Sequence, residues 1–240
     1  MTIRFNSIQQ KWNEDNPYDF SGLSALYLNC TLKKSPEVSN TEALMRHSMA
    51  IMEANKVKVE LIRIVDHPVA FGIYPDMKKY DWKEDAWPDI QKKVIKSDIL
   101  IIGTPIWLGE KSSVASMTIE RLYSNSAEAN HKGQYVYYGK TAGCIITGNE
   151  DGVKHCAMNL LFSLQHLGYS IPPQADAGWI GEIGPGPSYA DKDSGAVKND
   201  FTNRNTTFQA WNLMHMAKMI KENDGIPAWG NLPGEWERKE

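Results

Sequence analysis

The sequence has few cysteines, no long apolar stretch and no marked excess of charge of either sign. Its three cysteines are scattered and form no Cys-x-x-Cys pair, so they support neither a zinc site nor an iron–sulfur cluster. The apolar runs at residues 99–102 and 158–164 fall far below the roughly 20 residues that cross a bilayer. A net charge of −3 without a basic segment argues against a nucleic-acid partner.

The motifs of several nucleotide-dependent proteins are also absent. No Gly-x-Gly-x-x-Gly follows a strand and no Walker A sequence occurs, which argues against a Rossmann dehydrogenase and a P-loop NTPase. A receiver domain needs an aspartate where this chain has Gly103-Thr104. The six histidines show no His-x-x-x-His spacing, so we assign no metal ligand and no catalytic residue. The N-terminus lacks a signal-like apolar region, so we expect a cytoplasmic protein.

The chain instead alternates strand-like and helix-like segments, which is typical of a parallel sheet covered by helices on both faces. The second strand alternates apolar and charged residues and is expected at a sheet edge. The last strand contains Pro172-Pro173, which also favours an edge. The expected strands are residues 23–30, 56–64, 98–103, 141–147 and 169–174, and the expected helices are residues 39–55, 88–96, 112–123, 153–167 and 202–223.

Residues 23–223 are predicted to form one α/β domain, with an N-terminal extension at 1–22 and a tail at 224–240. In the extension, Phe5, Ile8 and Trp12 have helical spacing. Residues 66–87 are rich in proline and are expected to form an ordered surface loop. Residues 175–200 form a second long loop, and loops of this length usually serve function or an interface.

The loops after the first, third and fourth strands are the candidate site, because ligands bind beyond the carboxyl ends of strands in such sheets. The first loop leads into a helix with a Ser39-x-x-Glu42 capping box. Amides at a helix N-terminus, hydroxyls and one cation suit a phosphate monoester. The alternative is that Ser39 and Glu42 only cap the helix. The candidate phosphate ligands are Thr31, Lys33, Ser39, Asn40 and Thr41.

The second loop offers flat apolar surface and a close backbone approach, both of which suit an aromatic ring; alternatively, Trp107 only packs. The third loop opens another helix, whose amides and dipole suit the electron-rich edge of a reduced ring; alternatively, it is an acidic helix start with turn glycines. The candidate residues are Pro105, Ile106, Trp107, Leu108 and Gly109 in the second loop, and Thr147, Gly148, Asn149 and Gly152 in the third.

Together these motifs resemble the NADPH-dependent FMN reductase branch of the flavodoxin-like superfamily over about residues 23–170. The family's phosphate loop, Gly-Ser-x-Arg-x-x-Ser-Asn-Thr, is matched by Cys30-Thr31-Leu32-Lys33 and Ser39-Asn40-Thr41. Its Pro-x-x-x-Gly is matched by Pro105 to Gly109, its Asp-Arg by Glu120-Arg121, and its Thr-Gly by Thr147-Gly148.

The resemblance implies an α/β, flavodoxin-like, doubly wound sheet of five parallel strands in the order 2-1-3-4-5, with FMN held by the three loops. It also implies NADPH or NADH as electron donor, a small-molecule acceptor such as a quinone or flavin, and a homo-oligomer, with a dimer favoured. Residues 66–87 and those beyond Ala175 have no counterpart in the family pattern.

The phosphate loop departs from the family pattern. Cys30 replaces glycine, the loop is longer, and Lys33 replaces an arginine, which weakens bidentate phosphate binding. A flavodoxin-type electron carrier is the main alternative, although such carriers are commonly strongly acidic. A flavin-free interaction protein is the third possibility.

Overall fold

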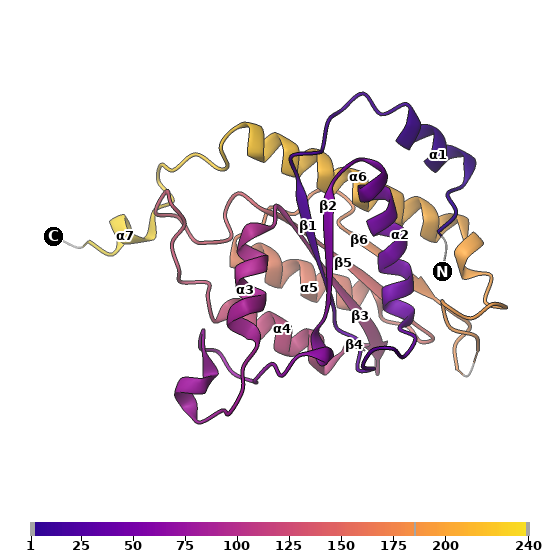
Figure 1. Ribbon diagram of the computed structural model, residues 1–240, viewed down its shortest axis with the longest axis horizontal. Coiled ribbons are helices and arrows are strands. Elements are labelled where there is room, and N and C mark those ends of the chain that lie inside the picture. Colours follow the sequence, from indigo (N-terminus) through magenta and orange to yellow (C-terminus); the bar gives the residue numbers. More distant parts are fainter. Residues whose placement is uncertain (1–2, 185, 239–240) are drawn as a thin grey trace.

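The computed structural model describes residues 3–184 and 186–238. Its centre is a sheet of five parallel strands in the order β2-β1-β3-β5-β6 (Figure 1). This order corresponds to the expected 2-1-3-4-5, so the α/β fold is confirmed. A short strand, β4 (Glu110–Lys111), runs antiparallel to the end of β3. The parallel strands are β1 (Ser24–Asn29), β2 (Lys58–Arg63), β3 (Ile99–Trp107), β5 (Thr141–Gly148) and β6 (Asp176–Ile180).

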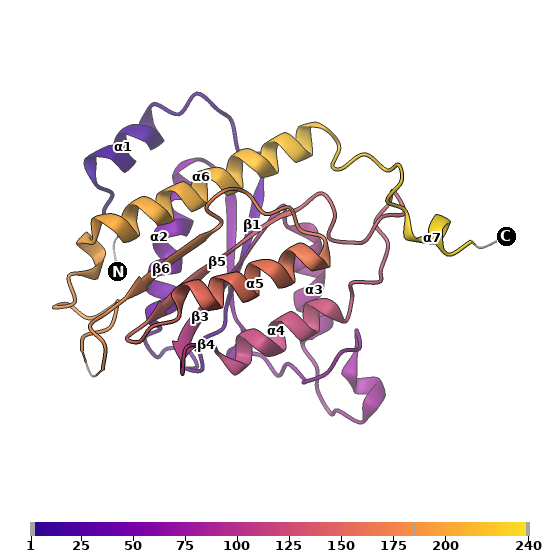
Figure 2. The same cartoon turned by 180° about the vertical axis from the view of Figure 1, so that it is seen from behind.

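Helices cover both faces of the sheet (Figure 2). Successive side chains of a strand point to opposite faces, so Leu26 and Leu28 of β1 pack in one buried cluster and Tyr27 in the other. The first cluster lies under α3 (Trp87–Lys96), α4 (Ser113–Tyr123) and α5 (Val153–Leu167), and the second under α2 (Asn40–Ala54) and α6 (Asp200–Glu222). Single 3₁₀ turns occur at Ile64–Asp66, Met77–Tyr80 and Ala196–Lys198.

The predicted position of the last strand is wrong. Instead of residues 169–174, the strand is Asp176–Ile180, and Ser170 makes only an isolated bridge to Thr141. Pro172 and Pro173 have no N–H to donate to a ladder, so regular pairing with β5 starts only beyond them. The predicted edge strand at residues 56–64 does lie at a sheet edge, as β2, and the other edge is formed by β6, whose residues were predicted to belong to the loop at 175–200.

The predicted capping box at the start of α2 is only half formed. The Ser39 hydroxyl accepts the Glu42 N–H at 3.1 Å. The Glu42 carboxylate does not return to the Ser39 backbone, because it binds the guanidinium groups of Arg63 and Arg46. Glu42 therefore connects α2 to the edge strand β2.

The N-terminal extension contains α1 (Ser7–Glu14), which packs against α2. Its buried contact is polar and was not predicted: the Gln9 amide lies 2.9 Å from His47 Nε2 and donates to Thr207 at 2.8 Å. Ile8 is exposed, and Trp12 stacks on Phe208. The C-terminal tail runs away from the sheet and contains α7 (Pro233–Trp236) (Figure 1). The division of the chain at residues 22 and 223 stays a prediction.

The proline-rich loop at residues 66–87 is held by a buried ion pair. Asp85 on the loop and Arg121 on α4 are joined at 2.7 Å, and both side chains are fully buried. Asp85 also accepts backbone N–H groups from Ala70, Met77 and Trp87. One carboxylate thus fixes three points of the loop to the domain.

Candidate functional site

A pocket of about 540 Å³ lies at the carboxyl ends of β1, β3 and β5. In a parallel sheet these ends meet along one edge, which is why loops distant in sequence converge here. Eleven of the fourteen predicted site residues line the pocket. They are Thr31, Lys33, Ser39, Asn40, Thr41, Pro105, Ile106, Trp107, Thr147, Gly148 and Asn149.

One end of the pocket is formed by hydroxyl groups and the N-terminus of α2. The Thr41 and Thr147 hydroxyls lie 2.9 Å apart and join the first loop to the third. Within the described part of the chain, the backbone N–H groups of Asn40 and Thr41 donate to no protein acceptor. Free amides at a helix start, next to Ser and Thr hydroxyls, suit an anionic group. Lys33 is an exposed cation on the same wall.

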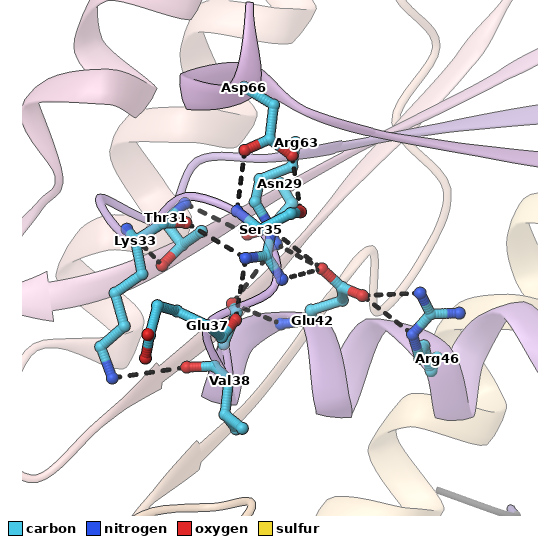
Figure 3. A network of polar contacts seen from close by, with 11 residues as sticks. Asn29, Thr31, Lys33, Ser35, Glu37, Val38, Glu42, Arg46, Arg63 and Asp66 are labelled. Carbon is cyan, nitrogen blue, oxygen red and sulfur yellow. Dashed lines mark hydrogen bonds and ion pairs between the residues drawn. The ribbon is translucent and has the colours of Figure 1, made fainter.

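The loop that carries Thr31 and Lys33 is held from behind by Arg63, the last residue of β2 (Figure 3). Its guanidinium donates to the carbonyl oxygens of Lys33 at 3.2 Å and Glu37 at 2.9 Å, and to the Glu42 carboxylate at 2.6 Å. Burial alone would raise the pKa of Glu42, but the hydrogen bonds and charges of Arg63 and Arg46 outweigh burial and lower it. The Glu42–Arg63 contact is therefore an ion pair at neutral pH.

The other end of the pocket is apolar and aromatic. Ile106 is buried, whereas Trp107 is 44% exposed. A Cβ atom at Gly148 would lie 3.0 Å from Ile106, so a larger residue there would displace the apolar wall. Trp179 packs edge-on against Tyr189 with ring centroids 5.6 Å apart. Burial raises the pKa of the Tyr189 hydroxyl to about 12.

Three predicted residues lie outside the pocket lining. Leu108 is 95% exposed, and its N–H and that of Gly109 donate to the Glu150 carboxylate at 3.0 and 3.2 Å. A Cβ atom at Gly152, where φ is +134°, would lie 2.7 Å from the Gly109 carbonyl oxygen. Leu108, Gly109 and Gly152 therefore shape the turn beside the pocket. His155 is also outside the lining and pairs with exposed Glu110 at 2.6 Å.

The segment after β6 forms a third side of the pocket, which the sequence analysis did not predict. The Asn149 amide donates to the carbonyl oxygen of Pro187 at 3.0 Å and accepts from the Ser188 hydroxyl at 3.0 Å. The Asn40 side chain accepts the Ala190 N–H at 2.9 Å. Asn149 and Asn40, both predicted site residues, thus hold residues 187–190 beside the pocket. In the sequence, only the length of the loop that contains this segment indicated a functional role. The missed lining residues are Val38, Glu150, Trp179, Ile183, Gly184, Ser188 and Tyr189.

Comparison with known proteins identifies the family. The sequence profile described as "NADPH-dependent FMN reductase" matches residues 24–179, which includes every strand of the parallel sheet except the last residue of β6. The chain belongs to this family. It is thus an enzyme of the NADPH-dependent FMN reductase family with a flavodoxin-like fold, as the resemblance implied.

The chain is also similar to two curated proteins and to one solved structure. The chain is 35% identical to the 8-demethyl-8-aminoriboflavin-5'-phosphate synthase of Streptomyces davaonensis, over 83% of this chain and 79% of that protein. It is similar to the crystal structure of RosB with the bound intermediate 8-demethyl-8-formylriboflavin-5'-phosphate. That similarity has a TM-score of 0.77 and 35% identity, and it covers 83% of this chain and 81% of that one.

A second relative is much longer than this chain. It is the divalent metal cation transporter MntH of Mycobacterium bovis, 57% identical over 87% of this chain but over only 31% of its own length. The transport named there is that of the longer protein. Among residues 3–184 and 186–238, no helix is long and apolar enough to cross a membrane, and no group of three or more acidic, His or Cys side chains is placed to hold a metal ion.

Proposed function

We propose that the pocket binds FMN and that the enzyme uses it to pass electrons from NADPH or NADH to a small acceptor such as a quinone or a flavin. The observation that supports this most strongly is the convergence of three loops on one pocket, in a chain of the FMN reductase family. The pocket volume of about 540 Å³ falls within the range of about 300–1,000 Å³ of small-molecule sites.

The residues present fit the two ends of FMN. The phosphate is assigned to the N-terminus of α2, where the amides of Asn40 and Thr41 and the hydroxyls of Thr31, Ser39 and Thr41 surround the pocket. The ring is assigned to the apolar end, against Ile106 and Trp107, with the turn at Gly148 at its edge. In this assignment Leu108, Gly109 and Gly152 support the ring site through the turn that they form.

Bound FMN supplies the chemistry, because flavins accept a hydride from a nicotinamide. The side chains bind and orient the cofactor and need not move a proton. Glu150 is the one carboxylate among the described lining residues, and it is held by two N–H groups at the turn. Ile183, Gly184, Ser188 and Tyr189 form a further wall of the pocket. We also propose a homodimer, in which aromatic residues of the extensions take part.

A second candidate function is chemical modification of the flavin phosphate itself. It is supported by the 35% identity and the TM-score of 0.77 to RosB, whose crystal structure contains a formylated riboflavin 5'-phosphate. In this case the same pocket would hold the flavin as a substrate, and the product flavin would leave.

The first experiment is a visible spectrum of the purified protein with FMN, before and after anaerobic addition of NADPH and, separately, of NADH. We expect a flavin band that bleaches within seconds with one of the two, and returns when a quinone is added. A band that persists with both nucleotides would favour an electron carrier. Mass spectrometry of the flavin after turnover tests the second candidate, which predicts a changed mass.

A further inference from the structure

The phosphate loop, residues 31–39, makes few hydrogen bonds of its own: the Lys33 N–H donates to the Thr31 hydroxyl and the Lys33 ammonium to the Val38 carbonyl, both at a long 3.4 Å. Within these nine residues, all of them described, one backbone hydrogen bond forms, from the Glu37 N–H to the Lys34 carbonyl at 3.0 Å. The Ser35 N–H and hydroxyl donate to the carboxylate of Asp66, which lies outside the loop. The loop is longer than the family pattern by several residues, so its conformation depends also on groups outside it.

Arg63 supplies part of that restraint, beside Asp66 and beside Asn29, which accepts the Thr31 N–H at 3.1 Å and donates to the Ser39 hydroxyl at 3.3 Å. Its Nη1 donates to the carbonyl oxygens of both limbs of the loop, at Lys33 and Glu37. Its Nη2 and Nε donate to Glu42 on the first turn of α2, at 2.6 and 3.2 Å. One planar guanidinium therefore fixes the two limbs and the helix start in one arrangement (Figure 3).

This arrangement determines where a loop amide points. In a trans peptide the N–H lies opposite the C=O, so a Glu37 carbonyl turned toward Arg63 turns the Val38 N–H away from it. Val38 lines the pocket, and its N–H donates to no acceptor in the described part of the chain. Arg63 itself does not line the pocket, and its guanidinium is paired with the Glu42 carboxylate, which also binds Arg46.

We infer that Arg63 is a positioning residue for phosphate recognition: it shapes the loop so that backbone amides face the 5'-phosphate, without touching the ligand. This inference rests on the proposed FMN site. A lysine at position 63 has one ammonium group and cannot reach both carbonyls and the carboxylate in the same planar arrangement. The identity of the residue therefore matters beyond its charge.

The test compares Arg63→Met and Arg63→Lys with Arg46→Met. Arg46 binds the same Glu42 carboxylate, at 2.6 and 2.9 Å, but no loop carbonyl, so it is a matched control. Dissociation constants are measured for FMN and for riboflavin, which lacks the phosphate. We expect Arg63→Met to raise the Kd for FMN by about 10- to 100-fold, Arg63→Lys to raise it less, and Arg46→Met to change it less than about threefold. The Kd for riboflavin should stay within about threefold in all variants.

Hydrogen exchange of the amides in residues 31–39 gives a readout that needs no flavin, and exchange should be faster in Arg63→Met than in Arg46→Met. If Arg63→Met fails to fold, the double variant Arg63→Met, Glu42→Gln removes the unpaired carboxylate and repeats the test. Equal losses for FMN and riboflavin, or no loss for either, would overturn the inference. A wild-type protein that binds both flavins equally, or neither, would instead overturn the proposed function, and the inference with it.

Discussion

Replacing Ser39 by aspartate should weaken FMN binding by at least about a hundredfold and leave the fold intact. Aspartate caps a helix as well as serine does, so the bond to the Glu42 N–H is kept. The new carboxylate would stand beside a phosphate that carries up to two negative charges. A unit charge pair at 4 Å costs about 4 kcal/mol at the effective dielectric constant near a protein surface, and about 2.7 kcal/mol already corresponds to a hundredfold.

The matched control is Ser39→Asn, which also caps a helix but adds no charge. Titration of both variants with FMN and riboflavin, followed by flavin fluorescence, separates charge from shape. We expect Ser39→Asn to bind FMN within about tenfold of wild type, and both variants to bind riboflavin as wild type does. An Ser39→Asp protein that is folded and still binds FMN tightly would place the phosphate elsewhere.

Replacing Asp85 by alanine should lower the free energy of unfolding by about 3–5 kcal/mol, because it leaves the Arg121 guanidinium buried without a counter-charge. The loss also removes the acceptor of three backbone N–H groups of the loop at residues 66–87. Urea unfolding at pH 7 measures the change. Because the free energy of unfolding of a domain is about 5–15 kcal/mol, a loss of this size should move the midpoint of unfolding to a much lower urea concentration.

Asp89→Ala is the control for a surface charge. Asp89 pairs with Lys92 at 2.8 Å, but both side chains are mostly exposed, and such pairs contribute little. Its unfolding midpoint should lie close to that of wild type, because a surface pair and a carboxylate in the first turn of α3 each contribute only a small part of the free energy of unfolding. The double variant Asp85→Ala, Arg121→Met should recover part of the loss, because it removes the buried charge. Equal midpoints for Asp85→Ala and Asp89→Ala would show that the buried pair does not hold the loop.

The sequence predicted those parts of the fold that depend on local patterns. The apolar run at residues 99–102 predicted the central strand β3, and the periodicity of residues 153–167 predicted α5. Strand order then followed from the family pattern. The carboxyl ends of parallel strands lie on the same side of the sheet. The positions of the three loops after these ends were therefore enough to predict that eleven candidate residues share one pocket.

The rest depends on contacts between residues far apart in the chain. Asn40 holds Ala190 across 150 residues, and Asp85 pairs with Arg121 across 36. No local signal distinguishes such an asparagine or aspartate from an exposed one. Arg63 is the last residue of a half-exposed edge strand, where a charged residue is common. The sequence therefore did not predict its hydrogen bonds to the phosphate loop. The lining residues Ile183, Gly184, Ser188 and Tyr189 follow no regular sequence pattern.

A crystal structure of the protein soaked with FMN would show whether the pocket holds the cofactor. We expect density for one FMN in the pocket at the carboxyl ends of β1, β3 and β5. Its phosphate should lie within hydrogen-bond distance of the amides at the start of α2, and its ring against Trp107. Density with the ring at the α2 end, density at another surface, or no density despite saturating FMN would show that the pocket does not bind FMN as proposed.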